Sequence, residues 1–170
     1  MPSPFDAWRR ARPPDAAREM VPAGQRLLAW GVCDDGSLVV AADGSLVLPE
    51  AGGAARVVPW ESVAQASWQD ERLEVVESGG GGRGRRTTVL DVRQPGALPE
   101  ALRERVTATI VVSEHVDLVG ELGARITARR SPGGATLTWV VTFDAGLDAR
   151  DPALREAADA AVARLKGQVE

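Results

Sequence analysis

Three arginines stand at the end of a glycine run in the segment SGGGGRGRRT, residues 78–87. Their type and spacing suggest two kinds of anion chemistry. A glycine loop cradles phosphate groups when the N-terminus of a helix follows it. Clustered guanidinium groups attract an anionic membrane surface by about 1 kcal/mol each. The candidate anion-binding residues are therefore Arg83, Arg85 and Arg86.

The context of the glycine run decides between these kinds of chemistry. Gly79, Gly81 and Gly84 match the spacing G-x-G-x-x-G, but any glycine tract matches it. A strand-like sequence, RTTVLDV, follows where a phosphate loop needs a helix. The segment is therefore predicted to be the flexible tip of a hairpin with a basic shoulder. No aromatic residue alternates with the arginines to stack on a base, so nucleic acid is not an expected partner.

The segment SEHVD contains the residue types of a hydrolase triad, Ser113, His115 and Asp117. These residues alternate along a predicted strand, which places neighbours about 6.6 Å apart in a row on one face. A triad instead needs hydrogen-bond contact between successive members. We therefore expect an exposed polar strand face and no catalytic residues. His115 is the only histidine, so we expect no metal site and no cofactor.

Dispersed carboxylates keep an enzymatic alternative open. The candidates are Asp34, Asp35, Glu61, Asp70 and Glu71. They predict a concave pocket with perturbed carboxyl groups, although nothing distinguishes them from ordinary turn and surface positions. The single cysteine, Cys33, lies in an apolar run and is interpreted as a small core residue.

The composition excludes several classes of protein. The chain has 170 residues and a net charge of −4, and an acidic chain is not suited to non-specific nucleic-acid binding. Its 20 basic residues include a single lysine, Lys166, which is typical of a high-GC bacterium. No stretch approaches the ~20 apolar residues of a membrane span, and the N-terminal segment lacks the apolar core of a secretory signal. We expect a soluble, cytoplasmic protein.

Alternating apolar residues and turn signals predict the elements that position these groups. They predict seven short strands at 27–33, 37–41, 46–49, 56–60, 62–68, 72–77 and 86–92, followed by a helix at 94–106. Three more strands, at 107–118, 123–130 and 136–143, precede a C-terminal helix capped by Asp151, with Pro152 in its first turn. A short helix at 15–20 is predicted to have Asp15 as its N-cap.

The predicted order of elements indicates an α+β fold that is mainly antiparallel β. We expect an N-terminal arm over 1–24, a β module with a helix over 25–106, and a three-strand extension plus C-terminal helix over 107–170, in one compact domain. The tryptophans are interpreted as core anchors, with Trp60 the one that could instead lie at a rim.

Two segments of this β module resemble bacterial PH-like domains, of the kind found in uncharacterised proteins of high-GC actinobacteria. The first is RVVPWESVAQASWQDERLEVVE (56–77), where a strand ends in a Pro-Trp pair before a Glu-Ser-Val step. The second is LLAWGVCDDGSLVVAADGSLVLP (27–49), upstream of it. The resemblance covers residues 25–106 and implies a bent seven-stranded sheet, or partial barrel, capped by a helix.

The same resemblance implies a non-enzymatic platform that binds an unidentified protein or peptide, with no catalytic residue set to carry over. The alternative is a peripheral binder of an anionic membrane or ligand, acting through the basic loop 79–86. In that case membrane contact would be weak and dependent on salt.

Overall fold

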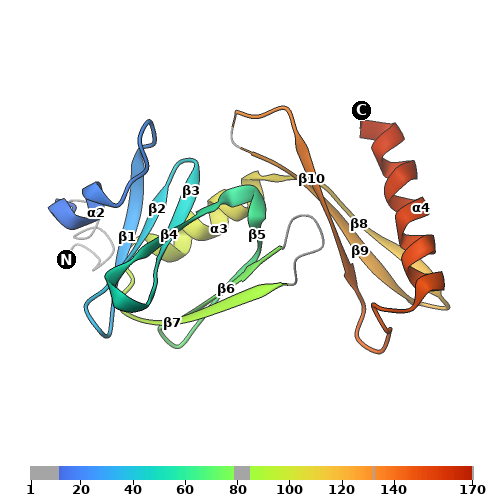
Figure 1. Ribbon diagram of the computed structural model, residues 1–170, viewed down its shortest axis with the longest axis horizontal. Helices are drawn as coiled ribbons and strands as arrows, with labels where there is room; N and C mark the ends of the chain where they lie inside the picture. The colour runs from blue at the N-terminus through green and yellow to red at the C-terminus, as the bar shows by residue number, and fades with distance from the viewer. Residues whose placement is uncertain (1–11, 79–84, 132, 170) are drawn as a thin grey trace, which may run out of the picture. The chain divides into compact units, whose positions relative to one another are not determined.

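The computed structural model describes residues 12–78, 85–131 and 133–169 (Figure 1). Contacts divide the chain into two compact units, the first built from residues 1–109 and 131–134 and the second from residues 110–130 and 135–170. The fold is mainly antiparallel β, with a mid-chain helix and a C-terminal helix. This confirms the predicted α+β class.

The first unit is built on a seven-stranded antiparallel sheet. In chain order its elements are α2 (Asp15–Glu19), β1 (Leu27–Cys33), β2 (Leu38–Ala42), β3 (Ser45–Pro49), η1 (Ala51–Gly53), β4 (Ala55–Pro59), η2 (Trp60–Ser62), β5 (Val63–Gln69), β6 (Arg72–Glu77), β7 (Arg86–Gln94) and α3 (Leu98–Ala108). The strand order is β4-β3-β2-β1-β7-β6-β5, so the sheet is not closed and β4 and β5 form its two edges.

Tight turns set the register of this sheet. Asp43 and Gly44 alone link β2 to β3, as the sequence predicts for Asp-Gly between apolar runs. Asp70 and Glu71 link β5 to β6 with φ angles of 48° and 64°. Two successive left-handed residues suit the twist of a two-residue hairpin.

The core of the first unit lies on the sheet face that α3 covers. Leu98 and Leu102 of α3 are buried against residues of β1–β7, including Leu46 and Leu73. Trp60 is fully buried in the same cluster, and its Nε1 donates a hydrogen bond of 2.8 Å to the carbonyl oxygen of Ala42. The rim position considered for Trp60 is therefore wrong. Strand β4 ends at Pro59, and the 3-10 turn that follows carries the indole into the core.

Several predicted element boundaries need correction. The mid-chain helix begins at Leu98 and extends to Ala108, so the next strand begins at Ile110 and not at residue 107. Asp15 is the first residue of α2 and not its N-cap; Pro14 holds that position without a side-chain cap. This helix packs on the other face of the sheet, where Ala17 is buried beside Val40 and Val47.

The second unit is a three-stranded antiparallel sheet with one helix. Its elements are β8 (Ile110–Val119), β9 (Leu122–Arg130), β10 (Leu137–Phe143) and α4 (Pro152–Val169), with the strand order β10-β9-β8. Oδ1 of Asp151 accepts a hydrogen bond of 2.9 Å from the backbone N–H of Ala153, which confirms the predicted cap. Helix α4 lies against this sheet (Figure 1). Its residues Ala161 and Leu165 pack on Ile126 of β9, as the predicted apolar stripe requires.

Candidate functional site

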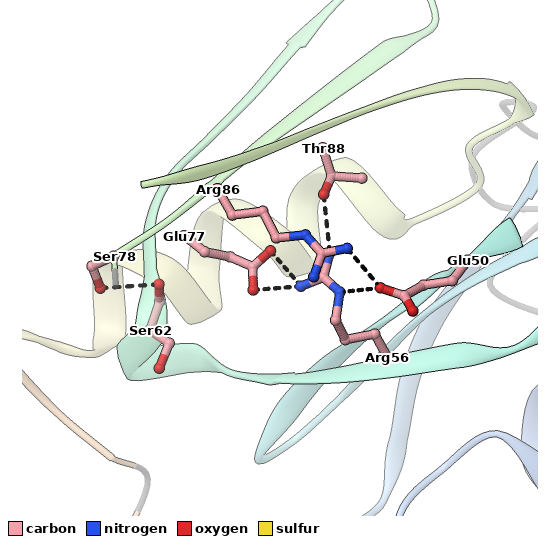
Figure 2. Close-up of polar contacts among 7 residues, drawn as sticks. All are labelled: Glu50, Arg56, Ser62, Glu77, Ser78, Arg86 and Thr88. Carbon is pink, nitrogen blue, oxygen red and sulfur yellow. Dashed lines mark hydrogen bonds and ion pairs between the residues drawn. The ribbon is translucent and has the colours of Figure 1, made fainter. Parts of the chain in front are cut away.

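A polar cluster lies between β4 and the strand pair β6–β7 of the first unit (Figure 2). At its centre, the guanidinium of Arg56 binds both carboxylate oxygens of Glu77 and donates to Thr88 Oγ1 at 3.0 Å. Its Nε donates to Glu50 Oε1 at 2.6 Å, and Arg86 Nη2 donates to the same oxygen at 2.8 Å. Arg56 and Glu77 are largely buried, with 18% and 15% of their side-chain surface exposed.

This cluster balances its own charge, because two arginines face two carboxylates. The hydrogen bond from Arg56 holds the pKa of Glu50 below its usual value, and the charge of Arg86 adds to the effect. Burial opposes the charged form of Arg56, but its bonds to Glu77 and Glu50 outweigh that cost and raise its pKa. The cluster is therefore a structural tie across the sheet, with no charge left over for an anion.

The structure separates the three predicted anion-binding arginines. Arg86 lies in the cluster around Arg56, where Glu50 engages it. Arg85 is exposed, and Arg83 lies outside the described residues together with the expected hairpin tip. The flanking strands pair Glu77 with Arg86. Sequence reasoning missed the pairing of Arg56 with Glu77, because no local pattern links residues that are 21 positions apart.

In the second unit, Ser113, His115 and Asp117 lie on the sheet face opposite α4, because they alternate with Glu114 and Val116, which contact that helix. His115 Nδ1 lies 3.3 Å from Asp117 Oδ1, so these two side chains do meet, contrary to the expectation of a non-converging row. Ser113 Oγ instead accepts a hydrogen bond of 3.4 Å from Arg125.

Asp144, which directly follows β10, is the residue that the sequence reasoning missed in this cluster. His115 Nε2 lies 2.8 Å from Asp144 Oδ2, and the same oxygen accepts a hydrogen bond of 2.7 Å from the backbone N–H of Gly123. Both hydrogen bonds lower the pKa of Asp144, and the bond from His115 has the larger effect. Both ring nitrogens of His115 thus face carboxylates, which leaves neither placed to accept a proton from a hydroxyl nucleophile.

We expect the hydrogen bonds of Asp144 to stabilise the fold in a pH-dependent manner. A carboxyl group whose pKa is lowered on folding contributes stability above its unfolded pKa, near 3.8, and loses it as the pH falls through the lower folded value. The wild type should therefore exceed the Asp144→Asn variant in unfolding free energy at pH 5, and the difference should shrink toward pH 3. Urea unfolding at several pH values measures both curves. Parallel curves over this range would contradict the assignment.

A hollow of about 360 Å³ gathers carboxylates at one end of the first sheet. Asp34 and Asp35 line it together with Glu50 and Asp91. Partners already engage three of these groups: Ser37 hydrogen-bonds Asp35, Arg72 pairs with Asp91 at 3.1 Å, and two arginines bind Glu50. The bonds from Ser37 lower the pKa of Asp35. A general acid at neutral pH needs a raised carboxyl pKa. The pKa values of Asp35 and Glu50 are lowered, so neither carboxyl group is suited to that role.

The remaining sequence candidates do not join this hollow. Asp70 and Glu71 form the β5–β6 turn, and Glu61 lies in the turn η2. Cys33 lines the hollow, but its side chain belongs to the core cluster, and burial raises the pKa of its thiol. It is thus a core residue with little thiolate at neutral pH, as interpreted from the sequence.

An apolar groove of about 370 Å³ runs between β5 and α3. Its lining residues are Ala66, Ser67, Trp68, Leu73, Pro99, Leu102, Arg103, Val106 and Thr107. Strand alternation turns Ala66 and Trp68 toward the helix, where both pack on the core, while Gln65, Ser67 and Gln69 are exposed. Ala66 is the smallest of the side chains facing α3 here, and it leaves room beside the indole of Trp68.

The groove lies beside an unprotected edge of the sheet. In the part of the chain that the structure describes, β5 pairs with β6 on one side only. Its sequence, VAQASWQ, contains no charge and no proline, the two features with which proteins usually block an edge. The opposite edge, β4, contains both Arg56 and Pro59, and Arg56 is tied to β6 and β7. Within the described residues, β5 is therefore the edge that offers space for a further strand along residues 65–69.

Comparison with known proteins found no matching family model, no similar curated protein and no similar solved structure. Among residues 12–78, 85–131 and 133–169, no three His, Cys, Asp or Glu side chains are grouped so that they could hold a metal ion. None of the helices in those ranges combines the length and the apolarity needed to cross a membrane.

Proposed function

We propose that the chain is a non-enzymatic, PH-like module that binds another protein through an extended peptide segment. The segment adds a strand to the open edge of β5 and places an apolar side chain in the groove between β5 and α3. The observation that carries this proposal is the uncharged edge of β5 lying directly beside that groove. In this mode of recognition, main-chain hydrogen bonds supply affinity and side-chain pockets supply specificity.

The architecture supports the PH-like part of the proposal. Seven antiparallel strands form an open sheet, and one helix covers its core face. This is the arrangement that the resemblance to bacterial PH-like domains implies. We also propose that the protein is cytoplasmic and comes from a high-GC actinobacterium. The buried free thiol of Cys33 suits a reducing compartment, and the excess of arginine over lysine suits the source.

The electrostatics of the polar groups support a non-enzymatic role. The pKa values of Asp35, Glu50 and Asp144 are lowered by hydrogen bonds, whereas a carboxyl group poised for acid catalysis has a raised value. His115, the only histidine, is held between two carboxylates. These groups are therefore arranged to stabilise strands and not to transfer protons.

Anion binding through the loop 79–86 has less support. Arg86 is one of its three arginines, and its guanidinium is already paired with Glu50 at 2.8 Å. An anion would compete with that carboxylate for Arg86, which reduces the expected attraction to a membrane surface. Arg85 is exposed and keeps its charge available.

The groove can be tested with a selected peptide. Random twelve-residue peptides displayed on phage would be selected against the full chain, and the enriched peptides synthesised. We expect their affinity to fall at least tenfold with Ala66→Phe, because a phenyl ring fills the space beside Trp68. Ala55→Phe, on the opposite edge strand β4, is the matched control and should leave affinity unchanged. Isothermal titration calorimetry measures both.

Two results would contradict the proposal. One is a selection in which no peptide is enriched above background. The other is a set of enriched peptides that bind the Ala66→Phe variant as tightly as the wild type, since they would then bind elsewhere. Circular dichroism in the near ultraviolet would establish that both variants keep the packing of their tryptophans.

A further inference from the structure

Among the described residues that line the groove between β5 and α3, a single one is charged, and its charge is positive. This residue is Arg103, and no described carboxylate lines the groove. The other lining side chains are apolar or carry a neutral hydroxyl group, as Ser67 and Thr107 do. A ligand that fills the groove therefore meets one uncompensated cation beside apolar walls.

The position of Arg103 on α3 directs it to this groove. Pro99, Leu102, Arg103, Val106 and Thr107 follow the spacing i, i+3, i+4, i+7 and i+8, which places them on one face of a helix. Leu102 is buried under the groove floor, whereas Arg103 is exposed. The helix thus presents an exposed guanidinium group next to an apolar surface that it shares with Trp68.

Arg103 also differs from the arginines that stabilise the fold. Arg56, Arg72, Arg86, Arg105 and Arg164 each pair with a carboxylate. Within the described residues, the guanidinium group of Arg103 has no hydrogen bond or ion pair. Its two acidic neighbours on α3, Glu100 and Glu104, do not line the groove, and Glu104 pairs with Arg105. No interaction within the described chain accounts for the charge of Arg103.

We infer that Arg103 selects the partner: the extended peptide carries a carboxylate beside its apolar anchor, and Arg103 binds that carboxylate. The inference rests on the proposed peptide-binding function and adds the chemistry of the ligand. A planar guanidinium group binds a carboxylate through two parallel hydrogen bonds, which fixes orientation as well as charge. The carboxylate comes either from an Asp or Glu side chain or from the C-terminus of the peptide.

The experiment uses two peptide libraries and synthetic ligands from each. One library displays peptides with a free C-terminus, and the other displays them with the C-terminus fused to the carrier. Each enriched peptide is synthesised as selected, with its acidic residue changed to the amide, and with its C-terminus amidated. Affinities are measured for the wild type, Arg103→Gln and Arg103→Lys. Arg93→Gln, which changes an exposed arginine of β7 outside the groove, is the control.

We expect loss of the peptide carboxylate to lower affinity for the wild type about tenfold, and to change affinity for Arg103→Gln by less than twofold. Such a thermodynamic cycle isolates the interaction, because a merely structural effect of the substitution would weaken acidic and amidated peptides alike. Arg103→Lys keeps the charge without the planar fork and should retain part of the effect. The control variant should behave like the wild type.

The outcomes separate this inference from the function on which it rests. Peptides that lose affinity for Ala66→Phe but bind Arg103→Gln as well as the wild type would overturn the role of Arg103 and leave the groove intact. Enriched peptides without any carboxylate would overturn it as well. Failure to enrich any peptide would overturn both proposals. Which of the two modified peptides loses affinity identifies the source of the carboxylate.

Discussion

Replacing Trp60 with alanine is expected to destabilise the first unit by about 3–5 kcal/mol, the usual cost of removing a buried aromatic side chain. Trp60 has no exposed surface and is the largest fully buried side chain of the described core. Its removal leaves a cavity in the core cluster, which is formed by residues of strands β1–β7 and of α3. The carbonyl oxygen of Ala42 also loses the hydrogen bond from the indole.

A Trp60→Phe variant separates these two contributions. Phenylalanine retains most of the apolar contact but has no N–H to donate to Ala42, so we expect a smaller loss of about 1–2 kcal/mol. Amide hydrogen exchange is the suitable measurement, because it reports the opening of β1–β7 separately from that of β8–β10. A loss below about 1 kcal/mol for Trp60→Ala would be inconsistent with the buried position.

The environment of Trp60 shows where sequence reasoning ends. The alternation of apolar residues places β4 and β5 correctly to within a residue, since strand periodicity is a local property. The direction of the indole depends on the 3-10 turn between those strands. The sequence Pro-Trp-Glu-Ser does not predict that turn. A tryptophan after a proline is compatible with both a rim and a core position, and the tertiary packing decides.

Contacts between segments that are distant in the chain could not be predicted from the sequence, for a different reason. Arg86 is a candidate anion-binding residue only in the alternative function, and Glu50, 36 residues away, engages it. Asp144 was not singled out, because it completes the cluster with His115 across the width of a sheet, 29 positions along the chain. Pairing of this kind depends on strand register, which a single sequence specifies only weakly for polar faces.

The candidate groove illustrates the same limit. Each of its walls was predicted as an element, since Trp68 lies in an expected strand and Arg103 in an expected helix. The predicted sheet order did not specify that β5 is an edge or that α3 lies beside it. The absence of charge and proline in VAQASWQ is visible in the sequence, but it acquires meaning only for a strand at the edge of a sheet.

The second unit offers an equally sharp test at Gly123, where Gly123→Ala is expected to destabilise the β8–β9–β10 sheet by about 2–4 kcal/mol. A Cβ atom at this position would lie 1.8 Å from the carbonyl oxygen of Val116 and 2.9 Å from the Cα of Asp117. Both are backbone atoms of β8, so no side-chain rotation relieves the overlap. The two strands would have to separate where their register already shifts, between Asp117 and Val119.

Separation at Gly123 would also affect the polar cluster of the second unit. The backbone N–H of Gly123 donates to the Asp144 carboxylate, and its carbonyl oxygen accepts from the Asp144 N–H at 2.9 Å. Gly167→Ala is the matched control, because nothing lies within 4 Å of a Cβ atom there and alanine favours the helix α4 by up to about 1 kcal/mol. Hydrogen exchange of the β9 and α4 amides should therefore show the same substitution acting with opposite signs within one unit. Equal effects at the two glycines would mean that β8 and β9 do not approach each other as closely as this steric argument requires.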